Sequence, residues 1–510
     1  MNRLDLKSDE TREITGRNRF WFRRYLPVVL ALCVLVLYMG LWRQVWFDEL
    51  LHFAMGGMTL EYAIKTIDYT TTEVNHGQTG FYLLLDWFLL QLFGASTIAL
   101  RLPSLISAAV MLASAVAFMR AKGFGWKWQS VSVIAFGANS TLMFFAGEAR
   151  PYMPMAASAV AMLAYFSLPD QDRRSWWGRS LGAFGFLFGA LIHPYWILLW
   201  GLVAFYSSTL YLTSSACNRS LKSLLIFLAP RLSLSAFVLY LVVGQLTWMR
   251  RVFTFAGDPN SIYDWNVIRS SFAWTHFSFV PQYMPARSSS WPTIVSGWAV
   301  AGIAALGLLS LVFMLLRKSC RTRSLIAPLG LIAVGVASSV FLTYLSYRSA
   351  YWILERQWVA GMTLTTLAVV WLYAQWWRNV RKRSALDKLP VIVYLGLLSS
   401  ALLAAAATQL QLTIERQQEW STFLNDTRTV QEFVADPGAQ TYVYDPIEGY
   451  EYMANVNVAR GGPVWEEFVA WYNKWAGMRP EFRESNPGWT RFIWPDVAPQ
   501  NRLCIPQLCQ

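Results

Sequence analysis

Charged residues are scarce in this chain of 510 residues. Asp, Glu, Lys and Arg make up 14% of it, whereas soluble domains contain about a quarter. Hydrophobic residues account for 55%, and long uncharged runs recur along most of the sequence. This composition excludes an ordinary soluble enzyme and predicts an all-α polytopic membrane protein.

Cysteine and the common catalytic motifs are also in short supply. Five cysteines are too few for a disulfide scaffold. Only Cys504 and Cys509 share a polar context, where either a short disulfide loop or two free thiols would fit. The patterns GxxxxGK[ST], HExxH, CxxC and GxSxG do not occur, so nucleotide hydrolysis, zinc proteolysis and serine hydrolysis have no motif support.

The net charge of +13 comes from short basic clusters that separate the apolar runs. This distribution orients membrane spans and does not form the continuous basic face of a nucleic-acid-binding protein, so we expect no nucleic-acid partner. The clusters predict cytoplasmic segments at 1–24, Arg120/Lys122/Lys127, Arg173/Arg174/Arg179, Arg219/Lys222, Arg317/Lys318/Arg321/Arg323 and Arg378/Arg381/Lys382/Arg383/Lys388.

The apolar runs between these clusters are long enough to cross a bilayer. They predict spans at about 25–42, 102–119, 128–146, 151–168, 180–192, 194–213, 232–249, 291–316, 324–347, 357–377 and 389–408. Residues 80–93 form one more apolar stretch, which we expect to be an interfacial or partly inserted helix. The alternative is that the Arg120/Lys122/Lys127 cluster does not mark a cytoplasmic loop.

This pattern divides the chain into three parts. Residues 1–24 are a cytoplasmic N-terminal segment, and residues 25–408 form a transmembrane domain of about 11 to 13 helices with an external loop at 43–79. Residues 409–510 are polar, aromatic and punctuated by Pro and Gly, which predicts a small external domain.

The informative polar residues lie beside the external membrane boundaries. They are Asp48 and Glu49 after the first span, His76 in the first loop, the Glu148-Ala149-Arg150-Pro151-Tyr152 segment, His193 at a hinge, and Arg356 before a late span. Ions at such positions are costly, so they usually pair or face a polar cavity. The Asp48-Glu49 pair is equally compatible with a solvated helix start, and Glu148 could simply pair with Arg150.

If these boundaries converge on one cavity, the cavity suits a lipid-linked anionic substrate. Arginine binds a phosphate with two parallel hydrogen bonds, and a carboxylate accepts the proton of an attacking hydroxyl. Asp48 and Glu49 are the catalytic candidates. His76, Glu148, Arg150, Tyr152, His193 and Arg356 are the donor-binding candidates.

Several of these segments, in this order, resemble the GT-C fold glycosyltransferases. They are Phe47-Asp48-Glu49, the His76 loop before Phe81-Tyr82-Leu83-Leu84, the run Phe93-Gly94 to Leu100-Arg101-Leu102-Pro103, and Glu148-Ala149-Arg150-Pro151-Tyr152. The likeness covers roughly residues 25–215. It is greatest to bacterial relatives of dolichyl-phosphate-mannose protein mannosyltransferases and lipid A aminoarabinose transferases.

The resemblance implies sugar transfer from a polyprenyl-phosphate carrier to an acceptor on the outer face of a bacterial inner membrane. Asp48 matches the catalytic base and Glu49 its companion, while Arg150 lies where the donor is approached. The chain departs from the family at His76-Gly77-Gln78-Thr79, often His-Pro-Pro-Leu, and at Arg356-Gln357, often Arg-Tyr.

Partners and competing functions stay open in part. The resemblance leaves the sugar, the acceptor (lipid, glycan or protein) and the metal requirement unspecified. It implies no definite cofactor, and a divalent cation is compatible with it. A polysaccharide polymerase or ligase would share the external arginines without needing the Asp48-Glu49 pair. A transporter or scaffold should place charge near the bilayer midplane, where Asp86 and Arg231 are the main candidates.

Overall fold

The structure is a computed structural model. It describes residues 49, 52, 60–61, 63–64, 80–94, 97–193, 195–213, 225, 229, 233, 236, 323–348, 358–400 and 402–403. Asp48, His76, Arg356, the N-terminal segment 1–24, the cysteines and the tail 409–510 lie outside the described residues. Within the described part, every secondary-structure element is helical, which confirms the predicted all-α class there.

The helices follow the predicted apolar runs closely. In chain order they are α4 (Gly80–Phe93), α5 (Thr97–Ala121), α6 (Trp126–Ala138), α7 (Ser140–Ala146), α8 (Tyr152–Ser167), α9 (Asp170–Arg174), α10 (Trp176–Ala183), the π-helical turn η3 (Phe184–Phe188), α11 (Gly189–Ile192), α12 (Trp196–Thr213), α18 (Arg323–Arg348) and α19 (Val359–Val380). A further helix covers 385–400.

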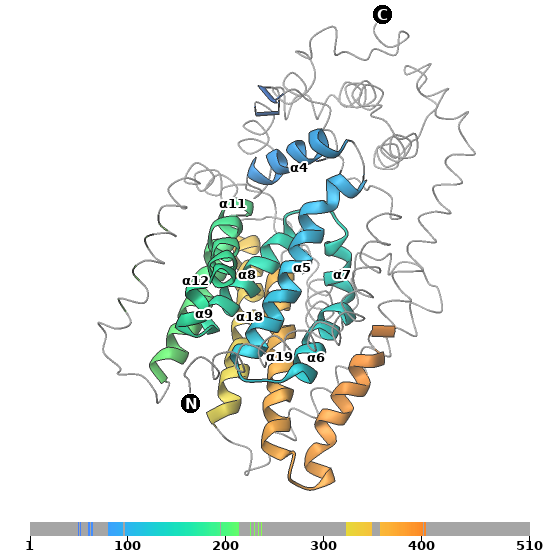
Figure 1. Ribbon diagram of the computed structural model, residues 1–510, viewed down its shortest axis with the longest axis vertical. Helices are drawn as coiled ribbons and strands as arrows, with labels where there is room; N and C mark the ends of the chain where they lie inside the picture. Colours follow the sequence, from blue (N-terminus) through green and yellow to red (C-terminus); the bar gives the residue numbers. More distant parts are fainter. Residues whose placement is uncertain are drawn as a thin grey trace, which may run out of the picture.

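Three of these helices are long and apolar enough to cross a membrane, namely those at Ile98–Ala121, Ser324–Tyr344 and Val359–Val380. The apolar helices α4, α8 and the Trp196–Leu210 part of α12 are shorter. Figure 1 shows most of these helices running roughly side by side, so that the described residues form a bundle. Lipid-facing backbone has no water to bond with, which favours this all-helical arrangement.

The predicted span 128–146 is broken into two helices. At Asn139 the backbone leaves the helical conformation (φ −85°, ψ 99°), which ends α6. The Asn139 side chain then accepts a hydrogen bond from the backbone N–H of Leu142 (3.2 Å) and caps α7. Asparagine can satisfy the exposed amide groups of a new helix, and it therefore permits a break inside an apolar run.

Helices α8 and α19 form the core of the bundle. In α8, every residue from Tyr152 to Ala164 is buried, and five of these are alanines, which lets neighbouring helices approach closely. In α19, 89% of the apolar window is buried. Helix α18 crosses α19 at Gly335 and Gly361, where a Cβ atom on either glycine would lie 2.5 to 2.6 Å from the other's carbonyl oxygen. In a membrane, the hydrophobic effect does not drive helices together. Small residues at such a crossing let the two backbones approach, and the close van der Waals packing stabilises the contact.

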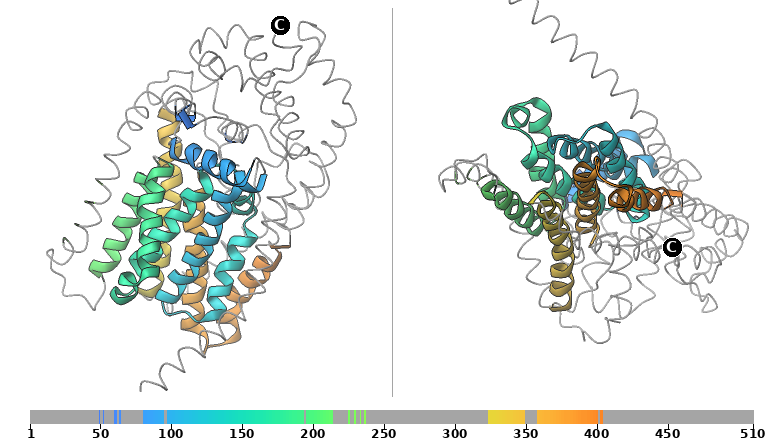
Figure 2. Two further views of the ribbon diagram at one scale, coloured as in Figure 1. Left: turned by 45° about the horizontal axis from the view of Figure 1, so that its top comes forward. Right: turned by 90° about the horizontal axis from the view of Figure 1, so that it is seen from below.

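Helix α4 has a different orientation from the bundle. Figures 1 and 2 show it lying across one end of the bundle, above the start of α5. Its buried face carries Tyr82 and Asp86, four residues apart, whereas Phe88 and Leu92 are exposed on its outer surface. An amphipathic helix in this position covers the end of the bundle with its polar side chains turned inward.

Candidate functional site

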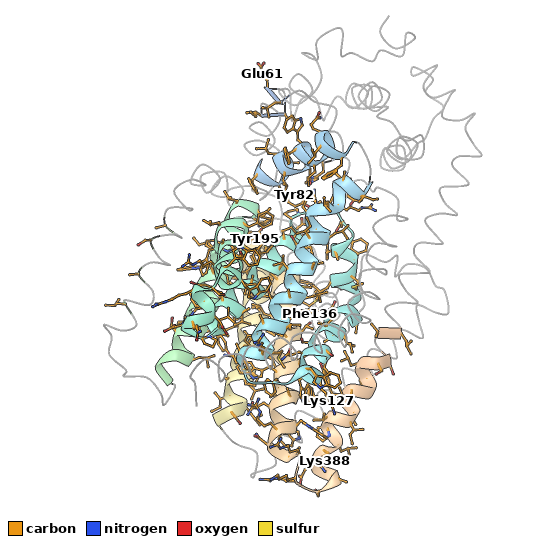
Figure 3. All side chains as sticks on the ribbon, in the orientation of Figure 1. Glu61, Tyr82, Lys127, Phe136, Tyr195 and Lys388 are labelled. Atoms are coloured by element: carbon orange, nitrogen blue, oxygen red, sulfur yellow. The ribbon has the colours of Figure 1, made fainter. Side chains whose placement is uncertain are left out.

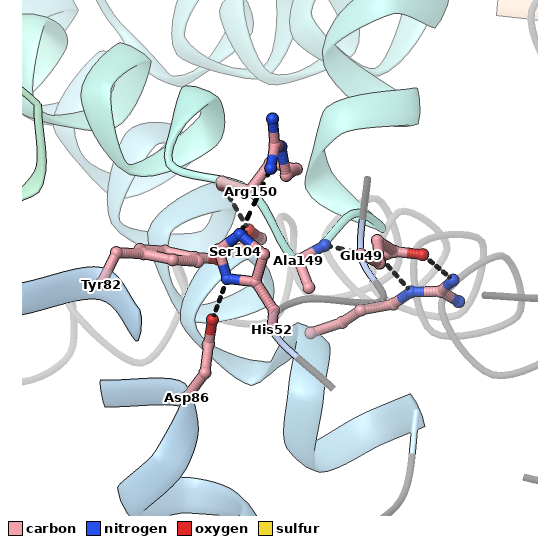
Figure 4. A network of polar contacts seen from close by, with 8 residues as sticks. Glu49, His52, Tyr82, Asp86, Ser104, Ala149 and Arg150 are labelled. Atoms are coloured by element: carbon pink, nitrogen blue, oxygen red, sulfur yellow. Dashed lines mark hydrogen bonds and ion pairs between the residues drawn. The ribbon is translucent and has the colours of Figure 1, made fainter. Parts of the chain in front are cut away.

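The buried polar groups converge where α4, the start of α5 and the α7–α8 turn meet. Figure 4 shows this network, which also includes Glu49 and His52 from the segment before α4. Six of its ionisable or polar side chains are fully buried: Glu49, His52, Tyr82, Asp86, Arg101 and Ser104. Buried charge of this kind requires partners, and the network supplies them.

Glu49 is held by three hydrogen bonds. Arg101 on α5 donates to it from Nε (2.9 Å to Oε1) and from Nη2 (2.6 Å to Oε2), the two-pronged geometry that guanidinium and carboxylate prefer. The backbone N–H of Ala149 adds a third bond to Oε1 (2.6 Å). Glu49 thus ties the α7–α8 turn to α5, and its carboxylate is already occupied as an acceptor.

The same turn is held from the other side by Ser104. Its hydroxyl donates to the carbonyl oxygen of Arg150 (3.2 Å). The Tyr82 hydroxyl lies 3.1 Å from the Ser104 oxygen. Because serine has only one O–H proton and uses it on Arg150, Tyr82 must be the donor in this second bond. Helices α4 and α5 therefore fix the backbone that carries Arg150.

His52 links Asp86 to the Arg150 side chain. Its Nδ1 lies 2.6 Å from Oδ2 of Asp86, and its Nε2 lies 3.4 Å from Nη1 of Arg150. A guanidinium can only donate, so Nε2 is the acceptor nitrogen and Nδ1 carries the proton that goes to Asp86. The geometry assigns the His52 tautomer and leaves the imidazole neutral next to Arg150.

The environment perturbs the acidity of Asp86 and Tyr82 on α4. Burial, followed by the negative charge of Glu49, raises the pKa of Asp86 well above its ordinary value, and Arg150 opposes this shift. Burial and then the charge of Asp86 raise the pKa of Tyr82 as well. Within the described residues, no donor reaches Oδ1 of Asp86. Asp86 is therefore a carboxyl that holds a proton more tightly than an exposed one.

The Arg150 side chain contacts a group of aromatic rings. Its guanidinium carbon lies 5.7 Å from the centre of the Tyr152 ring, a cation–π distance. The Tyr152 ring lies 6.3 Å from the His193 ring, and His193 Nδ1 accepts the backbone N–H of Tyr195 (3.2 Å). Arg150 is partly exposed while its neighbours are buried, so it is the member of the network that can meet a ligand.

Of the predicted site residues, the structure brings Glu49, Glu148, Arg150, Tyr152 and His193 to this end of the bundle. Asp48, His76 and Arg356 lie outside the described residues. Among the described ion pairs, none joins Glu148 to Arg150, so the simple pairing considered for these two side chains is not what the structure shows. Glu148 is fully buried.

The sequence analysis missed His52 and gave Asp86 a different role. Asp86 was considered an intramembrane charge typical of a transporter, but it lies on α4 at the end of the bundle, paired with His52. The spacing of Tyr82 and Asp86 places both on one helix face and could have indicated a shared site. His52 had no comparable signal, because its partner is 34 residues away in the chain.

A metal centre finds no support in the described part of the chain. No group of three or more His, Cys, Asp or Glu residues there is arranged to hold a metal ion. The acidic groups of the network are instead bonded to Arg101, to a backbone amide and to His52.

Comparison with known proteins gives two structural likenesses, whereas no protein-family model and no curated protein matches the sequence. ArnT from Cupriavidus metallidurans bound to undecaprenyl phosphate is similar with a TM-score of 0.45 and 14% identity, over 91% of this chain and 88% of that one. ArnT from the same organism in the apo state gives a TM-score of 0.31 and 15% identity, over 70% and 78%. Both TM-scores lie below 0.5, so the function is argued below from this chain's own residues.

Proposed function

We propose that the protein is an integral membrane glycosyltransferase of the GT-C type. It would transfer a sugar from a polyprenyl-phosphate donor to a cell-envelope acceptor at the outer face of a bacterial inner membrane. The observation that carries the proposal is the rigid turn at 147–151, which presents the partly exposed Arg150 at one end of an apolar helix bundle. An arginine fixed at that depth suits a phosphate whose lipid tail lies in the membrane.

The charge arrangement supports a phosphate next to Arg150. Glu49 is engaged by Arg101 and the Ala149 amide, and Nη1 of Arg150 lies 3.4 Å from Nε2 of His52. A neutral imidazole orients the guanidinium without cancelling its charge. The site thus retains a cation to stabilise the negative charge that develops on a departing phosphate.

In the proposed reaction, an acceptor hydroxyl oxygen attacks the anomeric carbon of the sugar. The bond from that carbon to the phosphate oxygen breaks, and the polyprenyl phosphate leaves with the electron pair. Asp48 takes the hydroxyl proton as general base, as the family resemblance implies, while the Glu49 carboxylate is held by Arg101 and the Ala149 amide. Glu49 is then a positioning residue for the turn.

The test is transfer of sugar from a synthetic polyprenyl-phosphate donor by purified protein, without an ion gradient. Asp48→Asn is nearly isosteric and should retain undecaprenyl phosphate binding while losing transfer, on the order of 10²- to 10⁴-fold. Turnover of Asp48→Asn within a few-fold of the wild type would contradict the base assignment. Absence of transfer or donor hydrolysis in the wild type with every donor would favour the transporter alternative.

Two further variants test the phosphate contact. Arg150→Lys keeps the charge and loses the planar guanidinium, so binding of undecaprenyl phosphate should weaken. Glu148→Gln removes a nearby negative charge and should tighten binding. If both variants bind like the wild type, Arg150 does not bind the phosphate. A polymerase or ligase of the same membrane would be recognised by its product, a lengthened or transferred glycan chain.

A further inference from the structure

The opposite end of the bundle carries a second polar feature that the proposed reaction does not use. Helix α5 connects the two ends: Arg101 lies near its start and the turn at 122–125 follows its end. The separation along the helix axis is about 30 Å, close to the thickness of the hydrocarbon core of a bilayer. Figure 3 shows Tyr82 and Lys127 towards opposite ends of the molecule.

At this end, the α5–α6 turn and the end of α19 enclose a pocket of about 320 Å³. Its lining combines aromatic rings with cations: Phe124, Trp126, Trp377, Lys127, Arg378 and Arg381. Tryptophan is typical of the membrane–water interface, and basic residues are typical of its cytoplasmic side. The composition is that of a site at the headgroup level of a bilayer.

Arg378, which lines this pocket, is held in a fixed position. Nη2 of Arg378 donates to the carbonyl oxygens of Lys122 (3.2 Å) and Gly123 (2.8 Å), and the guanidinium carbon lies 4.0 Å from the centre of the Phe124 ring. These contacts use one of its three nitrogens. Among the described residues, Nε and Nη1 make no hydrogen bond, so they are available to an outside acceptor.

The cations of the pocket have no acidic partner in the part of the chain that the structure describes. Within the described residues, no carboxylate comes within ion-pair distance of Lys127, Arg378 or Arg381. Lys127 and Arg381 are exposed on the surface of the protein. Three like charges around one hollow repel each other, and an anion that enters the pocket removes this repulsion.

We propose that this pocket binds the headgroup phosphate of an anionic glycerophospholipid of the cytoplasmic leaflet. Arg378 would donate to the phosphate from Nε and Nη1, with Lys127 and Arg381 adding charge, while the tryptophans pack against the glycerol and upper acyl carbons. Basic pockets between membrane helices on the cytoplasmic side favour such lipids. The lipid would fasten the α5–α6 turn to α19, at the end remote from the reaction.

The experiment measures retention of phosphatidylglycerol by the full-length protein in detergent micelles, using native mass spectrometry over a lipid titration. The test variant is Lys127→Gln/Arg381→Gln, which leaves the Arg378 contacts in place. The matched control is Arg383→Gln/Lys388→Gln, which removes two positive charges at the same end but outside the lining of the pocket. Equal melting temperatures in lipid-free micelles establish that all three proteins are folded.

We expect the test variant to bind phosphatidylglycerol on the order of tenfold more weakly than the wild type, because each cation near a headgroup contributes to binding. The control should bind like the wild type, and phosphatidylcholine should not compete. Equal retention by the wild type and both variants would overturn the proposal. So would competition by sn-glycerol 3-phosphate at the same concentration as the lipid, since it would show a site for soluble phosphates.

Discussion

The two ends of the helix bundle differ in the burial and pairing of their ionisable side chains. At the α4 end, most ionisable groups are buried and bonded to one another, Glu49 to Arg101 and Asp86 to His52, and Arg150 is partly exposed. At the other end, Lys127 and Arg381 are exposed, and together with Arg378 they surround a pocket without a described acidic partner. Both ends contain arginine side chains, but only at the α4 end do the described residues include acidic groups that bond to the basic ones.

The difference shows how location decides what a charge does. A buried ion loses its hydration and is tolerated only when a partner is fixed nearby, so the α4 end is rigid by necessity. An exposed cation stays hydrated, so it needs no fixed partner and can bind a mobile one such as a lipid headgroup. The first arrangement suits the positioning of reacting groups, and the second suits reversible binding of a lipid.

The largest expected effect comes from opening the buried pair. Arg101→Met leaves the Glu49 carboxylate buried without its charged partner, which should lower the free energy of unfolding by about 3 to 5 kcal/mol. Arg381→Met at the exposed end should change it by no more than about 0.5 kcal/mol. Thermal unfolding in detergent micelles measures both variants.

The double variant Glu49→Gln/Arg101→Met sharpens this comparison. Glutamine can still accept the Ala149 amide bond but carries no charge, so the double variant should be more stable than Arg101→Met alone. If Arg101→Met and Arg381→Met lose the same small amount of stability, the contrast between the two ends is wrong.

The next effect concerns pH. The pKa of Asp86 is raised by burial, so the folded protein binds this proton more tightly than the unfolded chain. Stability contributed by Asp86 is therefore present at low pH and is lost as the pH rises from the ordinary carboxyl range towards the raised pKa. Asp86→Asn cannot ionise, so its stability relative to the wild type should increase with pH over that window.

Melting temperatures recorded across this pH window for the wild type, Asp86→Asn and Asp172→Asn measure the effect. Asp172 lies on α9 and is exposed, so its variant should follow the wild type at every pH. Parallel curves for the wild type and Asp86→Asn would show that Asp86 holds no tightly bound proton.

The smallest effect concerns the neutral bonds that hold the turn. Ser104→Ala removes the bond to the Arg150 carbonyl and leaves the Tyr82 hydroxyl without its acceptor, which should cost about 1 kcal/mol. Transfer should fall as well, because the turn carries Arg150. Ser114→Ala is the control, since Ser114 bonds only to the Val110 carbonyl within α5. An equal loss of transfer in both variants would contradict the role of Ser104 in positioning the turn.

Much of the described fold was predictable from the sequence. Apolar length and basic clusters predicted helices at 102–119, 151–168, 324–347 and 357–377. Helices α5 and α18 cover their ranges, and α8 and α19 match theirs to within three residues at each end. A short helix at 80–93, separate from the span that follows it, was also expected, because one net crossing was needed between two charge-defined sides, and α4 is that helix. Hydropathy and length are properties of one segment of the chain, so they can be used for prediction without knowing which other segments pack against it.

The break between α6 and α7 at Asn139 was harder to predict from the sequence. One polar residue in an apolar run is compatible with a continuous helix. What separates α6 from α7 is the capping bond to Leu142, together with a contact from Asn139 Nδ2 to Thr366 Oγ1 on α19 (3.4 Å). The second contact joins residues 227 positions apart.

By itself, the sequence determined that the described chain is helical and apolar and that Glu49, Glu148 and Arg150 lie beside the ends of apolar runs. Only the tertiary structure decided which charges pair: Glu49 bonds to Arg101 and Ala149, 52 and 100 residues away, and His52 bonds to Asp86, 34 residues away. The physical reason is that hydrophobic burial is set by each segment's own composition. Hydrogen bonds require particular atoms to come within about 3 Å of each other, which only the packing of α4, α5 and the α7–α8 turn achieves.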